Sequence, residues 1–418
     1  MATRLEYSGI KYLNSLKNSK KPGLKSLMDT LSLLNSPQKL LKKNIIISGT
    51  NGKGTVAQIL NKIYVDAGYN VGLYTSPHLV KINERIKINN RSIRTDTLDR
   101  VLKKIIKVIQ ETSISLSYFE LLTAASILHF SNSQNDINIF EVGLGGRYDA
   151  TNVIKAKIGI LTNVEMDHME YLGETLEEIA YEKVGIINLN SILVTSVKTR
   201  SMKILNNYCK ESMTKILRLG NHFTVKYCNK SYKYSSPNYK LNFKSSLRGQ
   251  HQLSNLGVSL KAVEEVGKLY KLKVSKKNII SSLKNVTNPG RYEILNEKPL
   301  LVIDVSHNVH SIKTLISNFK IHYPRKKIYI ILGMLNEKNP QQCISLLLSI
   351  AKKIYLTDVP NPRSFKPKNL IKTLDNKKIS YLPNDKIPEL INKKKDLIIT
   401  GSIYLLGSLI SSKYVKLK

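Results

Sequence analysis

The sequence predicts an α/β protein in which parallel sheets are flanked by helices. Three observations support this fold class. Short apolar runs alternate with stretches of helical spacing from Asn44 to about Val286. A glycine-rich segment, Gly49–Thr55, directly follows the apolar run Ile45–Ile47. A second, shorter alternating series begins after Asn288-Pro289-Gly290, so we expect two α/β domains.

The first domain is expected to span residues 1–287 and to include a helical segment at its N-terminus. Short apolar runs that end in polar or glycine-rich residues are predicted strands: Ile45–Ile47, Val71–Tyr74, Ile137–Val142 and Ile158–Thr162. Helical spacing covers Val56–Ala67, Leu98–Ile109 and Phe119–Phe130. Between residues 198 and 247 the pattern weakens, and we expect only short strands there, such as Phe223–Tyr227.

The second domain is expected to span residues 288–418. The predicted helix Lys276–Lys284 ends before Pro289 and Gly290, which favour a turn. The strands predicted after this boundary are Leu300–Val305, Ile328–Leu332, Ile354–Leu356 and Leu397–Thr400. Helices are predicted between them, over Ser311–Phe319 and Pro340–Ile350. The alternation indicates a smaller, Rossmann-like α/β domain.

The loop Gly49–Thr55 indicates a nucleoside triphosphate site. Its glycines let main-chain N–H groups approach phosphate oxygens, Lys53 supplies a positive charge, and the following helix would direct its N-terminus at the anion. The loop is shorter than the standard P-loop, and Gly54 stands where a metal-binding hydroxyl is expected. A P-loop NTPase-like domain is the favoured interpretation, and a glycine-rich turn without a ligand is the alternative.

Composition excludes several classes of protein. The net charge of +36 comes mainly from Lys, with 12 Arg, and it is spread along the chain, so we expect weak attraction of anions and no specific nucleic-acid partner. No apolar stretch is long enough for a membrane span, and Met1–Glu6 lack a signal-peptide core. Three scattered cysteines support neither disulfides nor a thiolate metal site. We expect a cytoplasmic monomer.

Polar side chains follow three of the predicted strands. Ser76 follows the second strand, Glu141 lies at the end of the third, and Asp167 and His168 come after the fourth. Ligands of open parallel sheets bind at the carboxyl ends of strands, so these groups are expected beside Lys53. Oxygen ligands with one nitrogen suit Mg²⁺ or Mn²⁺, and Ser76 would supply the hydroxyl that the loop lacks. Singly, each residue could equally be a helix cap, a solvated carboxylate or a turn histidine.

Eight longer motifs occur in order along nearly the whole chain, with 198–246 the weakest part: 72–86, 119–125, 141–152, 171–180, 249–252, 289–291, 304–308 and 400–407. These motifs resemble the folylpolyglutamate synthase/dihydrofolate synthase family, bacterial bifunctional enzymes of the Mur ligase superfamily. The resemblance implies a first domain of the Mur ligase central-domain type and a C-terminal glutamate-ligase domain. Val309 departs from the proline that the family often has after its Asp-x-x-His-Asn motif.

The resemblance also implies a role for each matching residue. ATP phosphates would be bound by Thr50, Asn51, Gly52 and Lys53, and the nucleotide would be contacted from across the cleft by Asn255, Arg291 and Asp304. The metal ligands would be Ser76, Glu141 and His168, holding one or two Mg²⁺ ions. The pterin-side pocket would contain Ser117, Tyr118, Phe119, Glu120, Tyr148, Asp149 and Ala150. The catalytic residues would be Lys53, His307 and Lys183, the last carbamylated to N6-carboxylysine.

The implied reaction is an ATP-dependent amide ligation. A carboxylate of dihydropteroate or folate would attack the γ-phosphorus of ATP, and the amine of L-glutamate would displace phosphate from the acyl phosphate. Two alternatives remain open. One is another Mur-type ligase that acts on a different acid, and the other is a basic nucleic-acid-binding NTPase. The sequence does not decide between dihydropteroate and tetrahydrofolates as the acceptor.

Overall fold

The computed structural model describes residues 7–16 and 23–417, so the expectation for Met1–Glu6 lies outside the described residues. The chain divides into two compact units. The first comprises the chain up to His78, Ile82–Ser246 and Leu253–Val286. The second comprises Leu79–Lys81, Leu247–Gln252 and the chain from Thr287 onward. The division expected at residue 288 therefore differs at two short segments, which pack with the second unit although they precede it in sequence.

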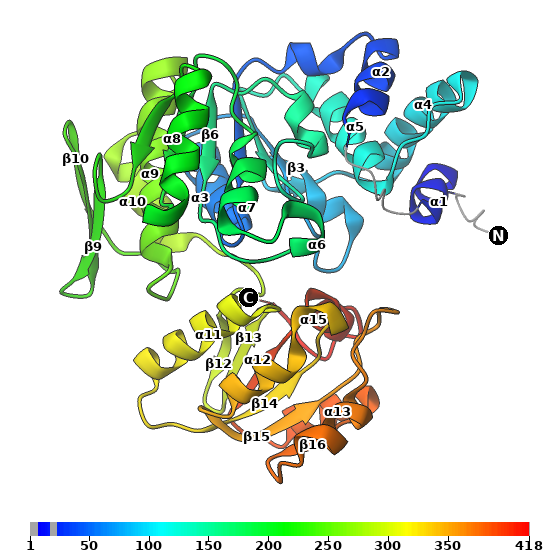
Figure 1. Cartoon of the computed structure of the whole chain (residues 1–418), viewed down its shortest axis with the longest axis vertical. Coiled ribbons are helices and arrows are strands. Elements are labelled where there is room, and N and C mark those ends of the chain that lie inside the picture. Colours follow the sequence, from blue (N-terminus) through cyan, green and yellow to red (C-terminus); the bar gives the residue numbers. More distant parts are fainter. Residues whose placement is uncertain (1–6, 17–22, 418) are drawn as a thin grey trace. The chain divides into compact units, whose positions relative to one another are not determined.

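The described part of the first unit is built on a mainly parallel, eight-stranded sheet (Figure 1). In spatial order its strands are β4 (Arg91–Ser92), β3 (Ile86–Ile88), β2 (Val71–Tyr74), β5 (Ile137–Glu141), β1 (Asn44–Ser48), β6 (Ile158–Leu161), β7 (Ile192–Thr195) and β8 (Lys215–Arg218). Strand β3 pairs antiparallel with both β2 and β4, and the other neighbouring strands pair parallel. The register places Ile47 beside Glu141 and Ser48 beside Leu161. The carboxyl ends of β1, β5 and β6 therefore lie at one edge.

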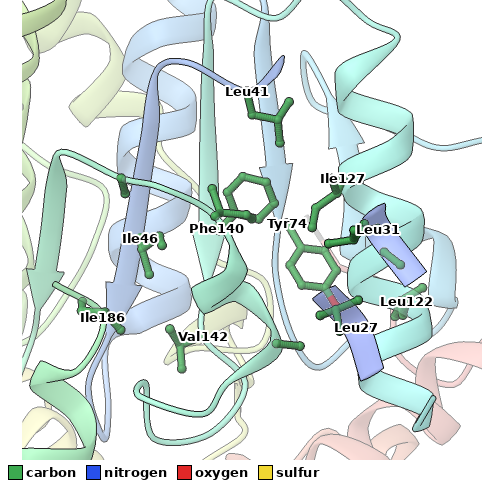
Figure 2. Packing of buried hydrophobic residues seen from close by; sticks show 14 of the residues in the cluster. Leu27, Leu31, Leu41, Ile46, Tyr74, Leu122, Ile127, Phe140, Val142 and Ile186 are labelled. Carbon is green, nitrogen blue, oxygen red and sulfur yellow. The ribbon is translucent and has the colours of Figure 1, made fainter. Parts of the chain in front are cut away.

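Helices cover both faces of this sheet, and β1 is buried along its whole length. The helices of the first unit are α1 (Ser8–Ser15), α2 (Lys25–Leu33), α3 (Lys53–Asp66), α4 (Thr95–Thr112), α5 (Tyr118–Ser131), α6 (Met169–Leu172), α7 (Leu176–Val184), α8 (Met202–Glu211), α9 (Gln252–Tyr270) and α10 (Lys276–Asn285). Figure 2 shows Ile46, Tyr74 and Phe140 of the sheet in one core with Leu31 of α2 and Ile127 of α5. Each such buried side chain contributes about 2 kcal/mol. This core supports the edge where the strands end.

A small antiparallel sheet follows in the segment where the sequence pattern is weak. Its strands are β9 (Thr224–Cys228), β10 (Ser231–Ser236) and β11 (Tyr239–Phe243), with β10 in the centre. Tyr234 of β10 is buried and donates a hydrogen bond to Glu264 of α9. Lys261 forms ion pairs with Glu264 and Glu265, at 3.2 and 3.0 Å. This polar network joins the small sheet to α9.

The second unit contains a six-stranded sheet in the described residues, with the order β12-β13-β17-β14-β15-β16. The strands are β12 (Glu293–Glu297), β13 (Leu300–Asp304), β14 (Ile328–Leu332), β15 (Ala351–Leu356), β16 (Ile379–Tyr381) and β17 (Leu397–Thr400). The helices are α11 (Val309–His322), α12 (Pro340–Leu347), α13 (Pro367–Leu374), α14 (Ile387–Asn392) and α15 (Ile403–Ser411). All strands except the edge strand β12 run parallel. The fold class expected for this part is therefore confirmed.

Among the described residues, no helix is long and apolar enough to cross a membrane.

The start of α11 shows how Val309 is accommodated in place of proline. The Asn308 side chain accepts a hydrogen bond from Ser311 N at 2.9 Å, which caps the helix. The helix therefore begins at residue 309 without the fixed backbone angle that a proline would provide.

Candidate active site

The loop between β1 and α3 has a backbone that requires glycine. Gly49 has φ +143°, and a Cβ there would lie 1.9 Å from Thr162 Oγ1. Gly52 has φ +87° and caps α3, which begins at Lys53. The loop therefore presents main-chain N–H groups at a helix N-terminus, an arrangement that binds phosphate.

Residues after β6 hold this loop in place. Asn163 accepts two hydrogen bonds, one from Thr50 N to its main-chain oxygen at 3.1 Å and one from Asn51 N to Oδ1 at 2.9 Å. Thr162 Oγ1 donates to Asn51 O at 2.6 Å. Sequence reasoning missed both residues. Their position directly after a predicted strand was the available signal, because strand ends meet at one sheet edge.

Lys53 and Asn255 both lie at the loop. Lys53 Nζ donates to Gly49 O at 2.7 Å, which places its ammonium over the loop. A Cβ at Gly52 would lie 2.5 Å from Asn255 Oδ1, so the Asn255 side chain packs directly on the loop backbone. Asn255, expected to contact the nucleotide from across the cleft, thus lies at the loop itself and in the same unit, and its contact with the nucleotide stays a prediction.

One loop side chain has an orphaned donor. Within the described residues, Asn51 Nδ2 is buried and has no hydrogen-bond partner. A buried amide left without a partner costs about 1–3 kcal/mol. An acceptor such as a phosphate oxygen would remove that penalty, which fits the nucleotide role expected for Asn51.

The structure brings Ser76 and Glu141 together beside the loop. Ser76 N donates to Glu141 Oε2 at 3.1 Å. A Cβ at Gly54 would lie 3.4 Å from Glu141 Oε1, so the carboxylate contacts the first turn of α3. Gly54, which replaces the expected hydroxyl, thus lies beside this carboxylate. His168 lies on another segment, where it occupies the N-cap position of α6 with φ +53° and makes no side-chain capping hydrogen bond.

The side chains of Ser76, Glu141 and His168 fit a Mg²⁺ site better than a site in which every metal ligand comes from the protein. In the described parts of the chain, no three His, Cys, Asp or Glu side chains gather closely enough to hold an ion. Mg²⁺ keeps several waters and is commonly held by one or two carboxylates together with substrate phosphates. Glu141 beside a phosphate loop supplies such a partial ligand set.

Lys183 is a buried lysine at the last turn of α7, 3% exposed. Its pKa is lowered to about 7, chiefly by burial and also by the charge of the neighbouring Lys53, while Asp167 and Asp149 oppose the shift. A neutral amine is a nucleophile, and an ammonium ion is not. The lowered pKa therefore makes the neutral amine of Lys183 more populated near neutral pH than that of an ordinary lysine.

Asp149 organises the loop that follows β5. Its Oδ2 accepts from Gly143 N and Leu144 N, each at 3.0 Å, and its Oδ1 accepts from Thr151 N and Oγ1. Burial raises its pKa, which the hydrogen bonds oppose. Asp149 therefore shapes the loop through these four hydrogen bonds.

The two neighbours of Asp149 that are expected in the pterin pocket differ in exposure. Tyr148 is 44% exposed, whereas Ala150 is buried.

Of the four candidate residues at the start of α5, two cap the helix and two present aromatic rings. Ser117 and Glu120, both expected in the pterin-side pocket, form a capping box, with Ser117 N donating to Glu120 Oε2 at 2.8 Å. The Phe119 ring lies against Gly143, where a Cβ would come within 2.6 Å of it. The Tyr118 ring lies 5.5 Å from the guanidinium of Arg85. Phe119 and Tyr118 thus offer aromatic surface, while the other two side chains stabilise the helix.

The second unit gathers its own candidate residues at the end of β13. Asp304 is buried and accepts from Tyr292 N at 2.7 Å and from Ser306 N at 2.8 Å. Burial raises its pKa, and its hydrogen bond to Ser306 and the charge of Arg291 lower it. The His307 ring is held by Val305 O, 2.9 Å from Nδ1. These residues share one edge of the second sheet.

The comparisons with known proteins identify the class. The family model described as the Mur ligase middle domain matches residues 47–263, and the one described as the Mur ligase, glutamate ligase domain matches residues 290–406. Together with the phosphate loop and the buried Lys183, these matches make the chain a Mur-type ligase, an enzyme that forms carbon–nitrogen bonds.

Relatives narrow this class to one family. A dihydrofolate synthase/folylpolyglutamate synthase of Bacillus subtilis is 30% identical, over 94% of this chain and 95% of the relative. The structure of E. coli FolC in complex with DHPP and ADP has a TM-score of 0.87 at 27% identity, covering 97% of both chains. A bifunctional folylpolyglutamate synthase/dihydrofolate synthase with Mn, AMPPNP and L-glutamate bound has a TM-score of 0.86 at 25% identity, covering 97% of both. The chain belongs to the dihydrofolate synthase/folylpolyglutamate synthase family.

Proposed function

We propose that this enzyme uses ATP to join L-glutamate to dihydropteroate, to tetrahydrofolates, or to both. The observation that carries the proposal is the loop at Gly49–Thr55, with the Lys53 ammonium over it and the Glu141 carboxylate against its first helical turn. That arrangement suits phosphoryl transfer from a nucleotide. The relatives' names and bound molecules, including ADP, AMPPNP and L-glutamate, support the substrates.

The proposed reaction has two steps. The carboxylate of the pterin acid attacks the γ-phosphorus of ATP, which forms an acyl phosphate and releases ADP. The amine of glutamate then attacks the acyl carbon, and phosphate leaves as the amide forms. Lys53 and the loop N–H groups would stabilise charge on the transferring phosphoryl group, and no Ser or Cys nucleophile is required. The exposed ring of Tyr148 and the ring of Phe119 would hold the pterin by stacking.

Ser76, Glu141 and His168 would hold one or two Mg²⁺ ions, which would neutralise phosphate charge when bound. Lys183 is proposed to react with CO₂ as a neutral amine and to become N6-carboxylysine, an anion. Its burial and lowered pKa support this modification. In the second unit, Arg291 and Asp304 would contact the nucleotide and His307 would act in catalysis.

Phosphate release tests the proposal most directly. We would incubate the enzyme with ATP, Mg²⁺ and L-glutamate, and compare dihydropteroate with tetrahydrofolate as acceptors. Release that requires both glutamate and one of these acids, with the glutamylated product detected by mass spectrometry, supports the proposal. Turnover only with an unrelated acid would instead indicate another Mur-type ligase.

We also propose that the enzyme acts as a monomer in the cytoplasm. The scattered cysteines, of which Cys209 and Cys343 are buried as free thiols, suit a reducing compartment. Light scattering of the purified protein and fractionation of cells would test the two parts separately.

A further inference from the structure

The end of α7 is bound to the loop after β5 through one asparagine side chain. Asn152 Nδ2 donates to two main-chain oxygens, Arg147 O at 2.9 Å and Gly185 O at 3.0 Å. Arg147 N also donates to Glu182 O at 2.8 Å. The last carbonyl groups of a helix have no partner within the helix, so Asn152 satisfies one that would otherwise depend on water.

Two glycines bring these backbones unusually close. A Cβ at Gly146 would lie 2.7 Å from Lys183 O, and a Cβ at Gly185 would lie 2.5 Å from Arg147 Cβ. Real Cβ atoms essentially never approach other atoms so closely. Packing at this distance leaves little room for the end of α7 to move while the hydrogen bonds of Asn152 are intact.

Arg147 covers the outside of the same junction. Its guanidinium carbon lies 5.1 Å from the Tyr148 ring centroid and 4.9 Å from that of Tyr181, and its nearest approach to the Glu182 carboxylate is 4.0 Å. The Arg147 side chain is 39% exposed, and such contacts contribute little at exposed sites. The neutral, half-buried amide of Asn152 is therefore the firmer link between the loop and the helix.

We propose that Asn152 is a positioning residue for Lys183. Lys183 lies between Glu182 and Gly185, the two points at which the loop holds the helix. The pair of hydrogen bonds from Asn152 fixes the helix end from which the Lys183 side chain extends. The proposal rests on the catalytic role proposed above for Lys183, which the test below examines separately.

The chain contains a second asparagine that makes the same pair of contacts and serves as a control, although it is fully buried and also accepts from Asn138 Nδ2 at 3.2 Å. Asn44 begins β1, at the opposite end of that strand from the phosphate loop, and its Nδ2 also donates to two main-chain oxygens, Leu41 O at 2.6 Å and Lys155 O at 2.9 Å. Asn→Asp removes the donors at either position with almost no change in shape, so both variants place a carboxylate against two carbonyl groups.

The experiment compares Asn152→Asp, Asn152→Ala and Asn44→Asp in the full-length enzyme. We expect Asn152→Asp to lower kcat at least tenfold with the KM for ATP within threefold of wild type, and Asn44→Asp to leave kcat within twofold. A second readout is labelling of Lys183 by an amine reagent, measured by peptide mass spectrometry. Labelling should become at least threefold faster in both Asn152 variants and stay unchanged in Asn44→Asp.

The outcomes separate this proposal from the role of Lys183 itself. Equal labelling rates in the Asn152 variants and Asn44→Asp would overturn the positioning role. Failure of both Asn152 variants to fold would assign the contact to folding, which also overturns it. If Lys183→Ala keeps wild-type activity, the proposed role of Lys183 fails, and the labelling rates still report whether Asn152 restrains its side chain.

Discussion

At the scale of single residues, the two lysines near the phosphate loop differ in environment. Lys53 is held over the loop by its hydrogen bond to Gly49 O, and in the proposed function its charge acts on the bound phosphates. Lys183 is 3% exposed and has a lowered pKa, so it is suited to reaction and poorly suited to holding a phosphate as a cation. Each lysine therefore leads to a different prediction.

Replacing Lys53 by alanine should abolish ligation. The charge that stabilises the transferring phosphoryl group is lost, and such losses cost about 10²–10³ in kcat. Phosphate release with either acid measures the effect. Lys62→Ala on the same helix is the control, because Lys62 pairs with Asp66 at 2.7 Å and should keep wild-type turnover. Unchanged turnover of Lys53→Ala would refute the assignment of the loop.

Stability should depend on pH through Lys183. Its pKa is about 7 in the folded protein and ordinarily 10.5, so between these values the unfolded chain binds one more proton. The free energy of unfolding should therefore rise with pH in this window, by up to about 1.4 kcal/mol per pH unit, relative to Lys183→Met. Urea unfolding of both proteins in CO₂-free buffer at pH 6, 8 and 9.5 checks this. Parallel profiles would contradict the lowered pKa.

At the scale of elements, the β1–α3 connection depends on backbone geometry. Gly49 combines a left-handed φ with a contact that leaves no space for a side chain. Gly68, after α3, also has a positive φ, but nothing lies within 4 Å of the position of its Cβ. The two glycines thus share a backbone conformation that other residues rarely adopt, and they differ in packing.

Gly49→Ala should lose nucleotide binding, whereas Gly68→Ala should keep it. Both substitutions carry a backbone cost on the order of 1–3 kcal/mol, but only the first displaces Thr162 and the loop that it holds. Calorimetric titration with ADP gives the affinity, and urea unfolding confirms that both variants are folded. ADP binding of Gly49→Ala at wild-type affinity would show that the loop tolerates the displacement.

At the scale of the whole molecule, the charge of +36 is the most conspicuous property. A P-loop NTPase that acts on nucleic acid would also be basic. The family matches over residues 47–263 and 290–406 identify the chain as a Mur-type ligase. The lysine excess therefore predicts only non-specific attraction of anions.

Duplex DNA should bind weakly and without effect on catalysis. Non-specific contacts are lost steeply with salt, so we expect no complex in a gel shift at about 0.2 M salt. Phosphate release should be the same with and without DNA. A complex that persists at this salt concentration and stimulates phosphate release would favour the nucleic-acid-binding NTPase instead.

Much of the molecule could be predicted from sequence because periodic patterns and glycine motifs are local signals. The strand Val71–Tyr74 is as predicted, β1 is longer than predicted by one residue at each end, and β5 is shorter by one residue at its carboxyl end. The small sheet β9–β11 was mostly missed, because its stability comes from contacts such as Tyr234 with Glu264, 30 residues apart. The fold class of both domains depended on local pattern and was confirmed.

The sequence by itself determined the α/β class, the phosphate loop and the family, since these are carried by residue types at fixed spacing. Only the tertiary structure decided how side chains are used. It showed that Ser117 and Glu120 cap helix α5, that Asn255 packs against Gly52, and that Asn152 holds the end of α7. Such contacts join residues far apart in the chain, and their distances follow from the packing of whole elements.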